Sequence, residues 1–130
     1  MFRVAVDFDG TIVEDRYPGI GRPRLFAFET LRAMQDRGIL LILWTMRTGP
    51  LLDDAVAFCA QHGIEFYAIN ASHPDEVLTP ETPRKINADM FIDDRNVGGM
   101  LAWGDIWNHV CGDQQPPAAQ RHRRLFGFKK

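Results

Sequence analysis

The sequence predicts an α/β fold in which a parallel β-sheet carries helices on both faces. Short apolar segments typical of strands alternate along the chain with longer segments of helical character. The segment 39–44, Ile-Leu-Leu-Ile-Leu-Trp, is apolar throughout, which is typical of a strand that is covered on both faces. Because strands that alternate with helices are joined by right-handed crossovers, we expect the strands to pair in parallel.

The first half of the chain contains two predicted strands with a helix between them. Residues 2–8 are mostly apolar and run into a glycine turn, which predicts a buried strand and then a polar connection over 10–22. Residues 23–37 have apolar side chains at partial three- and four-residue spacing, and Gly38 follows as a stop signal, so a helix is expected there. The apolar segment over 39–44 then predicts the second strand.

The second half repeats the alternation of helix and strand. Apolar spacing and a following glycine predict the helices, and a polar, proline-rich composition predicts the long connection. The expected elements are a helix over 51–62, a strand over 65–70, a loop over 71–84, a strand over 88–92 and a helix over 101–110.

Size and composition indicate one soluble domain. The chain has 130 residues, of which 45% are hydrophobic and 25% are charged. No apolar segment approaches the roughly 20 residues of a membrane helix, and no signal peptide is evident at the N-terminus. Cys59 and Cys111 form no Cys-x-x-Cys motif and are expected to be reduced thiols. We therefore expect a cytoplasmic protein with no membrane partner.

The charge is distributed unevenly between a body and a tail. Residues 1–117 hold 10 basic and 17 acidic residues, whereas residues 118–130 hold 5 basic residues and no acid. We expect a catalytic domain over 1–112, and a proline-containing linker with a basic, flexible tail over 113–130. The tail mixes arginine with aromatic residues, so it either binds polyanions such as nucleic acid or serves as a solubilising terminus.

Polar side chains follow all four predicted strands at the point where each strand ends. In parallel sheets ligands bind beyond the carboxyl ends of the strands, so these side chains should meet at one edge. They are Asp7 and Asp9 after the first strand, Thr45 and Arg47 after the second, Asn70 after the third, and Asp93 and Asp94 after the fourth.

The residue types at this edge favour phosphoryl chemistry. Asp7 and Asp9 are two positions apart on a strand and start on the same side, so they repel each other unless a cation or a reaction uses them. Oxygen ligands without a Cys/His cluster favour Mg²⁺ over zinc. Thr45 and Lys85 suit phosphoryl oxygens, and Gly10 begins a turn whose backbone N–H groups suit an anion.

With these residues in view, the chain resembles the haloacid-dehalogenase-like (HAD) superfamily of aspartate-nucleophile phosphohydrolases, and it looks most like its small capless hydrolases. The resemblance covers residues 2 to about 99 and implies a three-layer, Rossmann-like fold. It rests on Asp7-Phe8-Asp9-Gly10-Thr11-Ile12, Leu43-Trp44-Thr45, Lys85 and Phe91-Ile92-Asp93-Asp94, which occur in the family's order.

The resemblance implies a role for each matched residue. Asp7 is the nucleophile and Asp9 the general acid and base. Thr45 and Lys85 bind the phosphoryl group, with Lys85 also screening charge. The metal ligands are Asp7, the Asp9 backbone carbonyl and the acidic pair. In that pair Asp93 is the direct ligand and Asp94 binds directly or through water, or the two exchange these places. The further substrate-binding candidates are Gly10, Thr11, Met46 and Arg47.

Some assignments remain open between two readings. Arg47 either grips the substrate or caps the helix that starts near Gly49. Arg95 and Asn96 are expected to fix the acidic loop rather than to touch substrate.

Relatives often carry a cap domain, but neither 10–22 nor 71–84 is long enough to hold one. The site should be open, with selectivity from the loop residues Glu14, Asp15, Arg16, Tyr17 and Arg22 or from a second subunit in a homo-oligomer. An open site admits a small phosphate ester or a phosphorylated macromolecule.

Three alternatives to a phosphatase fit the sequence less well. A catalytically idle HAD-like module could bind a phosphorylated or nucleic-acid partner, but it would not need all the matched residues. A phospho-receiver domain would place its aspartate after the third strand, where this chain has Asn70. A dinucleotide-binding domain would need a Gly-x-Gly-x-x-Gly after the first strand.

Overall fold

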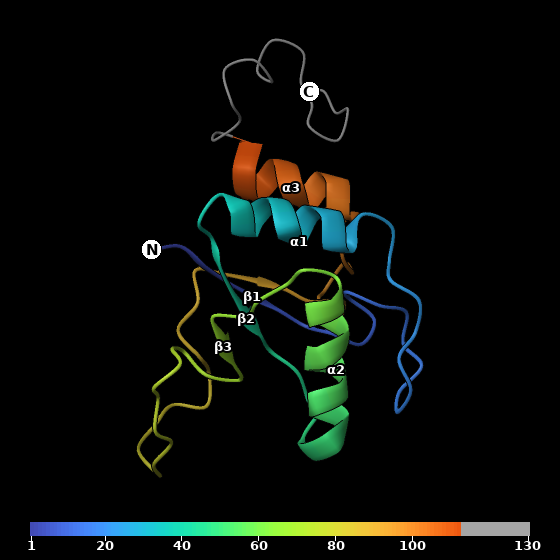
Figure 1. Cartoon of the computed structure of the whole chain (residues 1–130). Helices are drawn as coiled ribbons and strands as arrows, with labels where there is room; N and C mark the ends of the chain where they lie inside the picture. Colours follow the sequence, from blue (N-terminus) through green and yellow to red (C-terminus); the bar gives the residue numbers. More distant parts are fainter. Residues whose placement is uncertain (113–130) are drawn as a thin grey trace. The chain divides into compact units, whose positions relative to one another are not determined.

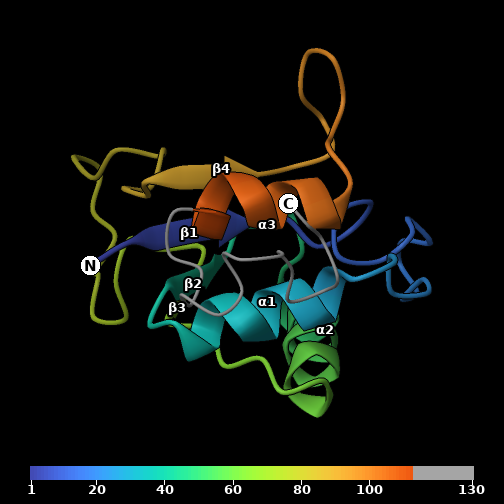
Figure 2. The ribbon, with the colours of Figure 1, turned by 90° about the horizontal axis from the view of Figure 1, so that it is seen from above.

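The computed structural model describes residues 1–112 and divides into two units between Met100 and Leu101. The first unit contains four parallel strands in the order β3-β2-β1-β4 (Figures 1 and 2). The chain is thus α/β, with a four-stranded parallel sheet and three helices. Its strands are β1 (Arg3–Val6), β2 (Leu40–Leu43), β3 (Ala68–Ile69) and β4 (Met90–Ile92).

The two faces of the sheet are both apolar. Val4 and Val6 lie on one face of β1, and Phe8, which continues this alternation, meets Phe58 edge-on at a centroid distance of 6.4 Å. Ala5 lies on the other face, in register with Ile42 of β2. Burial on both faces explains why β2 is a continuous apolar run and not an alternating one.

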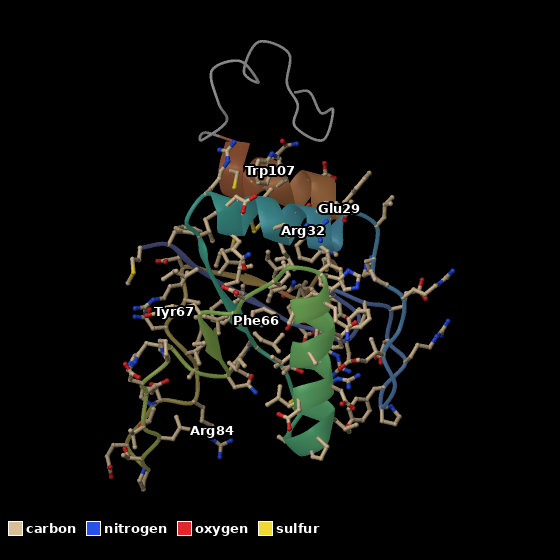
Figure 3. The ribbon with its side chains drawn as sticks, viewed as in Figure 1. Glu29, Arg32, Phe66, Tyr67, Arg84 and Trp107 are labelled. Atoms are coloured by element: carbon tan, nitrogen blue, oxygen red, sulfur yellow. The ribbon has the colours of Figure 1, made fainter. Side chains whose placement is uncertain are left out.

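Helices α1 (Ala27–Asp36) and α2 (Gly49–Gln61) pack against each other. Phe28 of α1 lies parallel to the ring of His62 at 4.1 Å and contacts Phe58 of α2 at 5.9 Å between ring centroids. The guanidinium of Arg32, labelled in Figure 3, donates to the carbonyl of His62 at 2.7 Å. Aromatic stacking and one charged hydrogen bond therefore join the two helices.

The face that carries Ala5 is covered by the segment that connects β3 to β4. Ile86 in this segment forms a buried cluster with Ala5, Ile42 and Ala68. Tyr67, labelled in Figure 3, packs on this cluster and also lies against the guanidinium of Arg3. In the first unit α1 and α2 thus pack together, and the three-layer arrangement with helices on both faces stays a prediction.

The second unit contributes helix α3 (Trp103–Cys111). Its buried residues recur every three or four positions, as expected for an amphipathic helix: Trp103, Ile106, Trp107, Val110 and Cys111. No helix among residues 1–112 is long and apolar enough to cross a membrane. The predicted linker and basic tail over 113–130 lie outside the described residues.

The predicted elements are all present, but most are shorter than expected. The first helix begins at Ala27 and not at 23, because Phe26 adopts a left-handed backbone conformation with φ of 66°. Pro23 instead forms a β-bridge with Val13, and the amide of Arg24 donates to the carbonyl of Ile12 at 2.8 Å. The connection after β1 is therefore fastened to the start of α1.

Candidate functional site

Three carboxylates gather where β1 and β4 end. Asp7 follows β1, and Asp93 and Asp94 follow β4, which pairs with β1 in parallel. One carboxylate oxygen from each residue lies within 4.8 Å of the other two. The sheet topology therefore brings together the acids that the sequence placed at separate strand ends.

The proximity of these acids changes the titration of Asp7. Burial and then the negative charge of Asp93 raise the pKa of Asp7 to about 7, and Asp94 adds to the effect. Ionised Asp7 is therefore unfavourable in this cluster unless a positive charge joins it. An oxygen-only donor set of this kind suits a hard divalent cation such as Mg²⁺.

Thr11 and Gly10 hold the cluster together from the turn after β1. The buried hydroxyl oxygen of Thr11 lies 3.2 Å from Asp7 Oδ2 and 3.0 Å from Asp94 Oδ1. The hydroxyl can therefore donate its proton to either carboxylate. The same oxygen accepts the backbone N–H of Asp94 at 3.0 Å. Gly10 has φ of 84°, and a Cβ there would lie 2.3 Å from Asp94 Oδ2. Only glycine lets the Asp94 carboxylate approach this turn.

This arrangement corrects the expectation that Gly10 and Thr11 bind substrate through the turn. The N–H of Gly10 donates to the carbonyl of Val13 at 2.8 Å, and the N–H of Thr11 donates to the carbonyl of Phe8 at 3.2 Å. Both donors are used within the turn. The two residues therefore position the acids and do not present an anion-binding surface.

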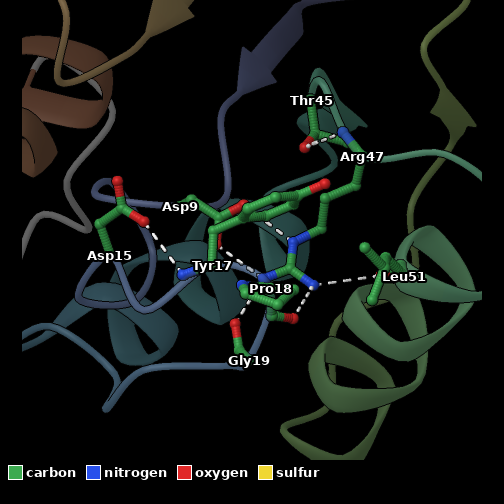
Figure 4. Close-up of polar contacts among 8 residues, drawn as sticks. All are labelled: Asp9, Asp15, Tyr17, Pro18, Gly19, Thr45, Arg47 and Leu51. Atoms are coloured by element: carbon green, nitrogen blue, oxygen red, sulfur yellow. Dashed lines mark hydrogen bonds and ion pairs between the residues drawn. The ribbon is translucent and has the colours of Figure 1, made fainter.

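Asp9 is held by a buried arginine. Arg47 Nε donates to Asp9 Oδ2 at 2.8 Å, and Nη2 donates to Oδ1 at 2.7 Å, which is a bidentate ion pair. Arg47 Nη1 also donates to the carbonyls of Pro18 and Leu51, both at 3.3 Å, and Nη2 donates to the carbonyl of Gly19 at 2.6 Å (Figure 4). All five N–H donors of the guanidinium thus have an acceptor.

The guanidinium of Arg47 also lies between two aromatic rings. Its central carbon is 5.1 Å from the ring centroid of Phe8 and 5.2 Å from that of Tyr17. Only 1% of the Arg47 side chain is exposed, and the hydrogen bonds to Asp9 raise the pKa of Arg47. Because every donor is engaged, the expectation that Arg47 grips substrate is corrected: it positions Asp9 and the loop around Pro18.

Thr45 and Asn70 join the site from the next two strands. The amide side-chain oxygen of Asn70 accepts the backbone N–H of Thr45 at 2.8 Å. The hydroxyl of Thr45 accepts the backbone N–H of Arg47 at 3.1 Å. The Asn70 backbone is left-handed, with φ of 53°, which asparagine tolerates better than most residues. Asn70 therefore supports Thr45 from β3.

An open cavity of about 440 Å³ adjoins these groups. Met46, which was expected to bind substrate, stands 92% exposed at this cavity. The lining residues are Asp7, Asp9, Asp15, Tyr17, Thr45, Met46, Arg47, Asp93 and Arg95. A ligand can therefore reach these groups from solvent.

The loop after β4 fixes Asp93. The carboxylate of Asp93 accepts the backbone N–H of Arg95 at 2.8 Å, and the Asn96 side chain donates to the Asp93 carbonyl. Asn96 thus holds the acidic loop, as expected. Arg95 does so through its backbone, while its side chain lines the cavity.

Four of the predicted site residues do not line this cavity: Gly10, Thr11, Lys85 and Asp94. Gly10, Thr11 and Asp94 belong to the acidic cluster beside it, whereas Lys85 lies elsewhere. Its ammonium nitrogen lies 5.5 Å from the ring centroid of Phe91, on the face of β4 away from Ile92. Among the described residues that line the cavity, Lys85 is absent. Its contact with a phosphoryl group stays a prediction.

Sequence reasoning missed the group that holds Asp9. Three of the five acceptors for Arg47 are backbone carbonyls, those of Pro18, Gly19 and Leu51, which carry no side-chain signal. The one sequence signal for a buried guanidinium is the presence of two aromatic residues next to charged ones: Phe8 lies between two aspartates, and Tyr17 follows an arginine.

Comparisons with known proteins give one informative relationship. No protein-family model matches the chain, and no curated protein matches it. A solved structure, described as that of a conserved protein coded by a locus of Bacteroides thetaiotaomicron, is 47% identical in sequence. The match covers 94% of this chain and 98% of that one, with a TM-score of 0.80. The description of that protein names no activity.

We predict that Gly10→Ala destabilises the protein more than Gly38→Ala, because the Asp94 carboxylate would have to leave its contact with Thr11. Both glycines have φ near 84°, but a Cβ at Gly38 meets nothing within 4 Å, whereas one at Gly10 strikes the Asp94 carboxylate. The shared backbone strain costs about 1–2 kcal/mol, and the clash adds to it only at Gly10. Urea unfolding measures both, and equal losses would contradict the close approach of Asp94.

We predict that Arg47→Met lowers the free energy of unfolding by about 3–5 kcal/mol, because it leaves Asp9 charged and unpaired. The control is Arg22→Met, since Arg22 pairs with Glu14 at 3.2 Å but is 82% exposed. That change should cost less than about 1 kcal/mol. Asp9→Asn combined with Arg47→Met should recover part of the loss. Similar costs for the two single variants would contradict a buried pair.

The raised pKa of Asp7 predicts a pH-dependent stability in metal-free protein. The folded state holds the Asp7 proton more tightly than the unfolded state, so stability falls as pH rises from the ordinary value of 3.8 through about 7. Asp7→Asn removes this loss. Its melting temperature in a chelator should therefore exceed that of the wild type by more at pH 8 than at pH 5. A difference that does not change with pH would contradict the account of Asp7.

Proposed function

The chain belongs to the same family as the conserved protein from Bacteroides thetaiotaomicron, and because the description of that protein names no reaction, we propose an activity from the site itself. We propose that the protein is a Mg²⁺-dependent phosphomonoesterase of the HAD-like type, which works through an aspartyl-phosphate on Asp7. The observation that carries the proposal is the approach of three carboxylates to within 4.8 Å beside a cavity that also contains Asp9 and Thr45.

The acidic cluster fits a magnesium ion. Asp7, Asp93 and Asp94 would hold it, since their oxygens are close together and their mutual repulsion calls for a positive charge. When bound, the ion would neutralise these acids and the charge of the substrate's phosphoryl oxygens. The fixed Asp93 loop and the Thr11 bridge would hold the acids in place without it.

In the first proposed step, a carboxylate oxygen of Asp7 attacks the phosphorus of the ester. A new oxygen–phosphorus bond forms at Asp7, and the bond to the leaving oxygen breaks with its electron pair. Asp9, which is ionised in its pair with Arg47, first takes up a proton from solvent and then gives that proton to the leaving oxygen. Arg47 takes one lone pair on each Asp9 oxygen, so a second lone pair on each remains for this proton.

In the second step, water attacks the phosphorus of the aspartyl-phosphate and Asp9 accepts a proton from it. The bond to Asp7 breaks, inorganic phosphate leaves and the Asp7 carboxylate returns. A carboxylate held with both oxygens on a guanidinium is well oriented to act as a base. Thr45 would donate its hydroxyl to a phosphoryl oxygen, because its other contact, with the Arg47 N–H, uses only a lone pair.

One observation favours a second candidate, a non-catalytic module that binds phosphorylated ligands. Lys85 contacts Phe91 and does not line the cavity. Without that cation a phosphoryl group would face several acids with less positive charge to offset them. Intact Asp7, Asp9 and Thr45 still favour the enzyme.

We predict Mg²⁺-dependent release of inorganic phosphate from at least one class in a panel of nucleotides, sugar phosphates, aryl phosphates and end-phosphorylated oligonucleotides. Asp7→Asn should reduce it to background, and Asp9→Asn should lower it by about 10²–10⁴-fold. Asp53→Asn is the control, because Asp53 is exposed on α2 and does not line the cavity. Release that survives in Asp7→Asn, or no release from any substrate, would contradict the phosphatase.

A further inference from the structure

We propose that Tyr17 is a stacking platform that selects phosphate esters whose leaving group carries a planar aromatic ring. The inference rests on the proposed function for the position of the phosphoryl group, and it names the substrate class. Two sources share this chemistry: the base of a nucleoside monophosphate and the ring of an aryl phosphate.

Tyr17 is the outer member of a three-layer stack. Phe8 is buried at the bottom, the Arg47 guanidinium lies in the middle, and the Tyr17 ring lies on top. The two contacts are 5.1 and 5.2 Å from the guanidinium carbon to the ring centroids. Tyr17 is 56% exposed, whereas the two layers beneath it are buried. The stack therefore ends at an aromatic ring that faces open space.

The backbone that carries the ring is held in place. The backbone N–H of Tyr17 donates to Asp15 Oδ1 at 3.2 Å, and the carbonyl of the next residue, Pro18, accepts from Arg47 (Figure 4). In the same connection, the N–H of Glu14 donates to the carbonyl of Arg22 at 2.8 Å. A side chain on an ordered backbone loses less conformational entropy when a ligand stacks on it than one on a mobile loop.

The platform lies at the cavity that holds the reacting groups. Tyr17 lines the same cavity as Asp7 and Thr45, and Figure 4 shows its ring extending across the Asp9–Arg47 pair. Met46 lines this cavity as well and is 92% exposed. A phosphoryl group at Asp7 would thus have its leaving group beside an aromatic ring and a flexible thioether, both suited to planar apolar surfaces.

The contact beneath the ring leaves one aromatic face for a ligand. The Arg47 guanidinium, whose charge Asp9 offsets, lies against one face of Tyr17. The other face is available to a planar group, and an aromatic ring of the substrate can stack on it.

The test measures binding to the full-length Asp7→Asn protein, so that turnover is not required. Calorimetric titrations compare adenosine 5′-monophosphate with ribose 5-phosphate, and phenyl phosphate with cyclohexyl phosphate, in the presence of Mg²⁺. We expect the aromatic member of at least one pair to bind about tenfold more tightly, as for one base stacked on an aromatic side chain. The pair that shows the preference identifies the source of the ring.

Tyr17 variants made in the Asp7→Asn protein decide whether Tyr17 is responsible for the preference for aromatic ligands. Tyr17→Phe should keep the preference, and Tyr17→Leu, which is apolar but not aromatic, should bring the affinity ratio close to one. Equal affinities within both pairs, or a preference that survives in Tyr17→Leu, would overturn the inference. A Tyr17-dependent preference without phosphate release by the wild type would overturn the phosphatase alone, whereas release without an aromatic preference would overturn the inference alone.

Discussion

The buried ion pair between Asp9 and Arg47 is the interaction on which the rest of the site depends. It joins the end of β1 to the start of α2 and to the carbonyls of Pro18 and Gly19. A buried guanidinium is costly unless all its donors are satisfied, and here all five are. This one side chain therefore fixes the direction of Asp9 and the course of the loop that carries Tyr17.

The cluster of three acids, in contrast, destabilises the folded protein. The carboxylates of Asp7, Asp93 and Asp94 are held close together by a glycine turn and one threonine hydroxyl, although burial and mutual repulsion raise the pKa of Asp7 to about 7. The close approach of these acids lowers the stability of the folded state, which is typical of sites that are completed by a ligand. Asp9 has its cation within the chain, whereas the three clustered acids are suited to receive theirs from solution.

Much of the site follows from the sequence because a parallel sheet aligns its strand ends. The alternation of apolar runs and helices was enough to place Asp7, Thr45, Asn70 and Asp93 at one edge, and each lies there. The start of α1 could not be predicted, since it depends on the left-handed backbone of Phe26 and on the bridge from Pro23 to Val13. The role of Arg47 was hidden for a similar reason: its partners are mainly carbonyls, which every residue has. Sequence spacing predicted a phosphate contact for Lys85, but the direction of that side chain depends on packing against Phe91.

In the proposed reaction, Asp7 carries the phosphoryl group during turnover. The most direct measurement is rapid acid quenching of the protein during reaction with a substrate found to release phosphate, followed by mass spectrometry of its peptides. The account predicts one phosphoryl group on the peptide that contains Asp7, located at that residue and absent from Asp7→Asn. Turnover with no phosphorylated Asp7 at any quench time, or with the group on another residue, would contradict it.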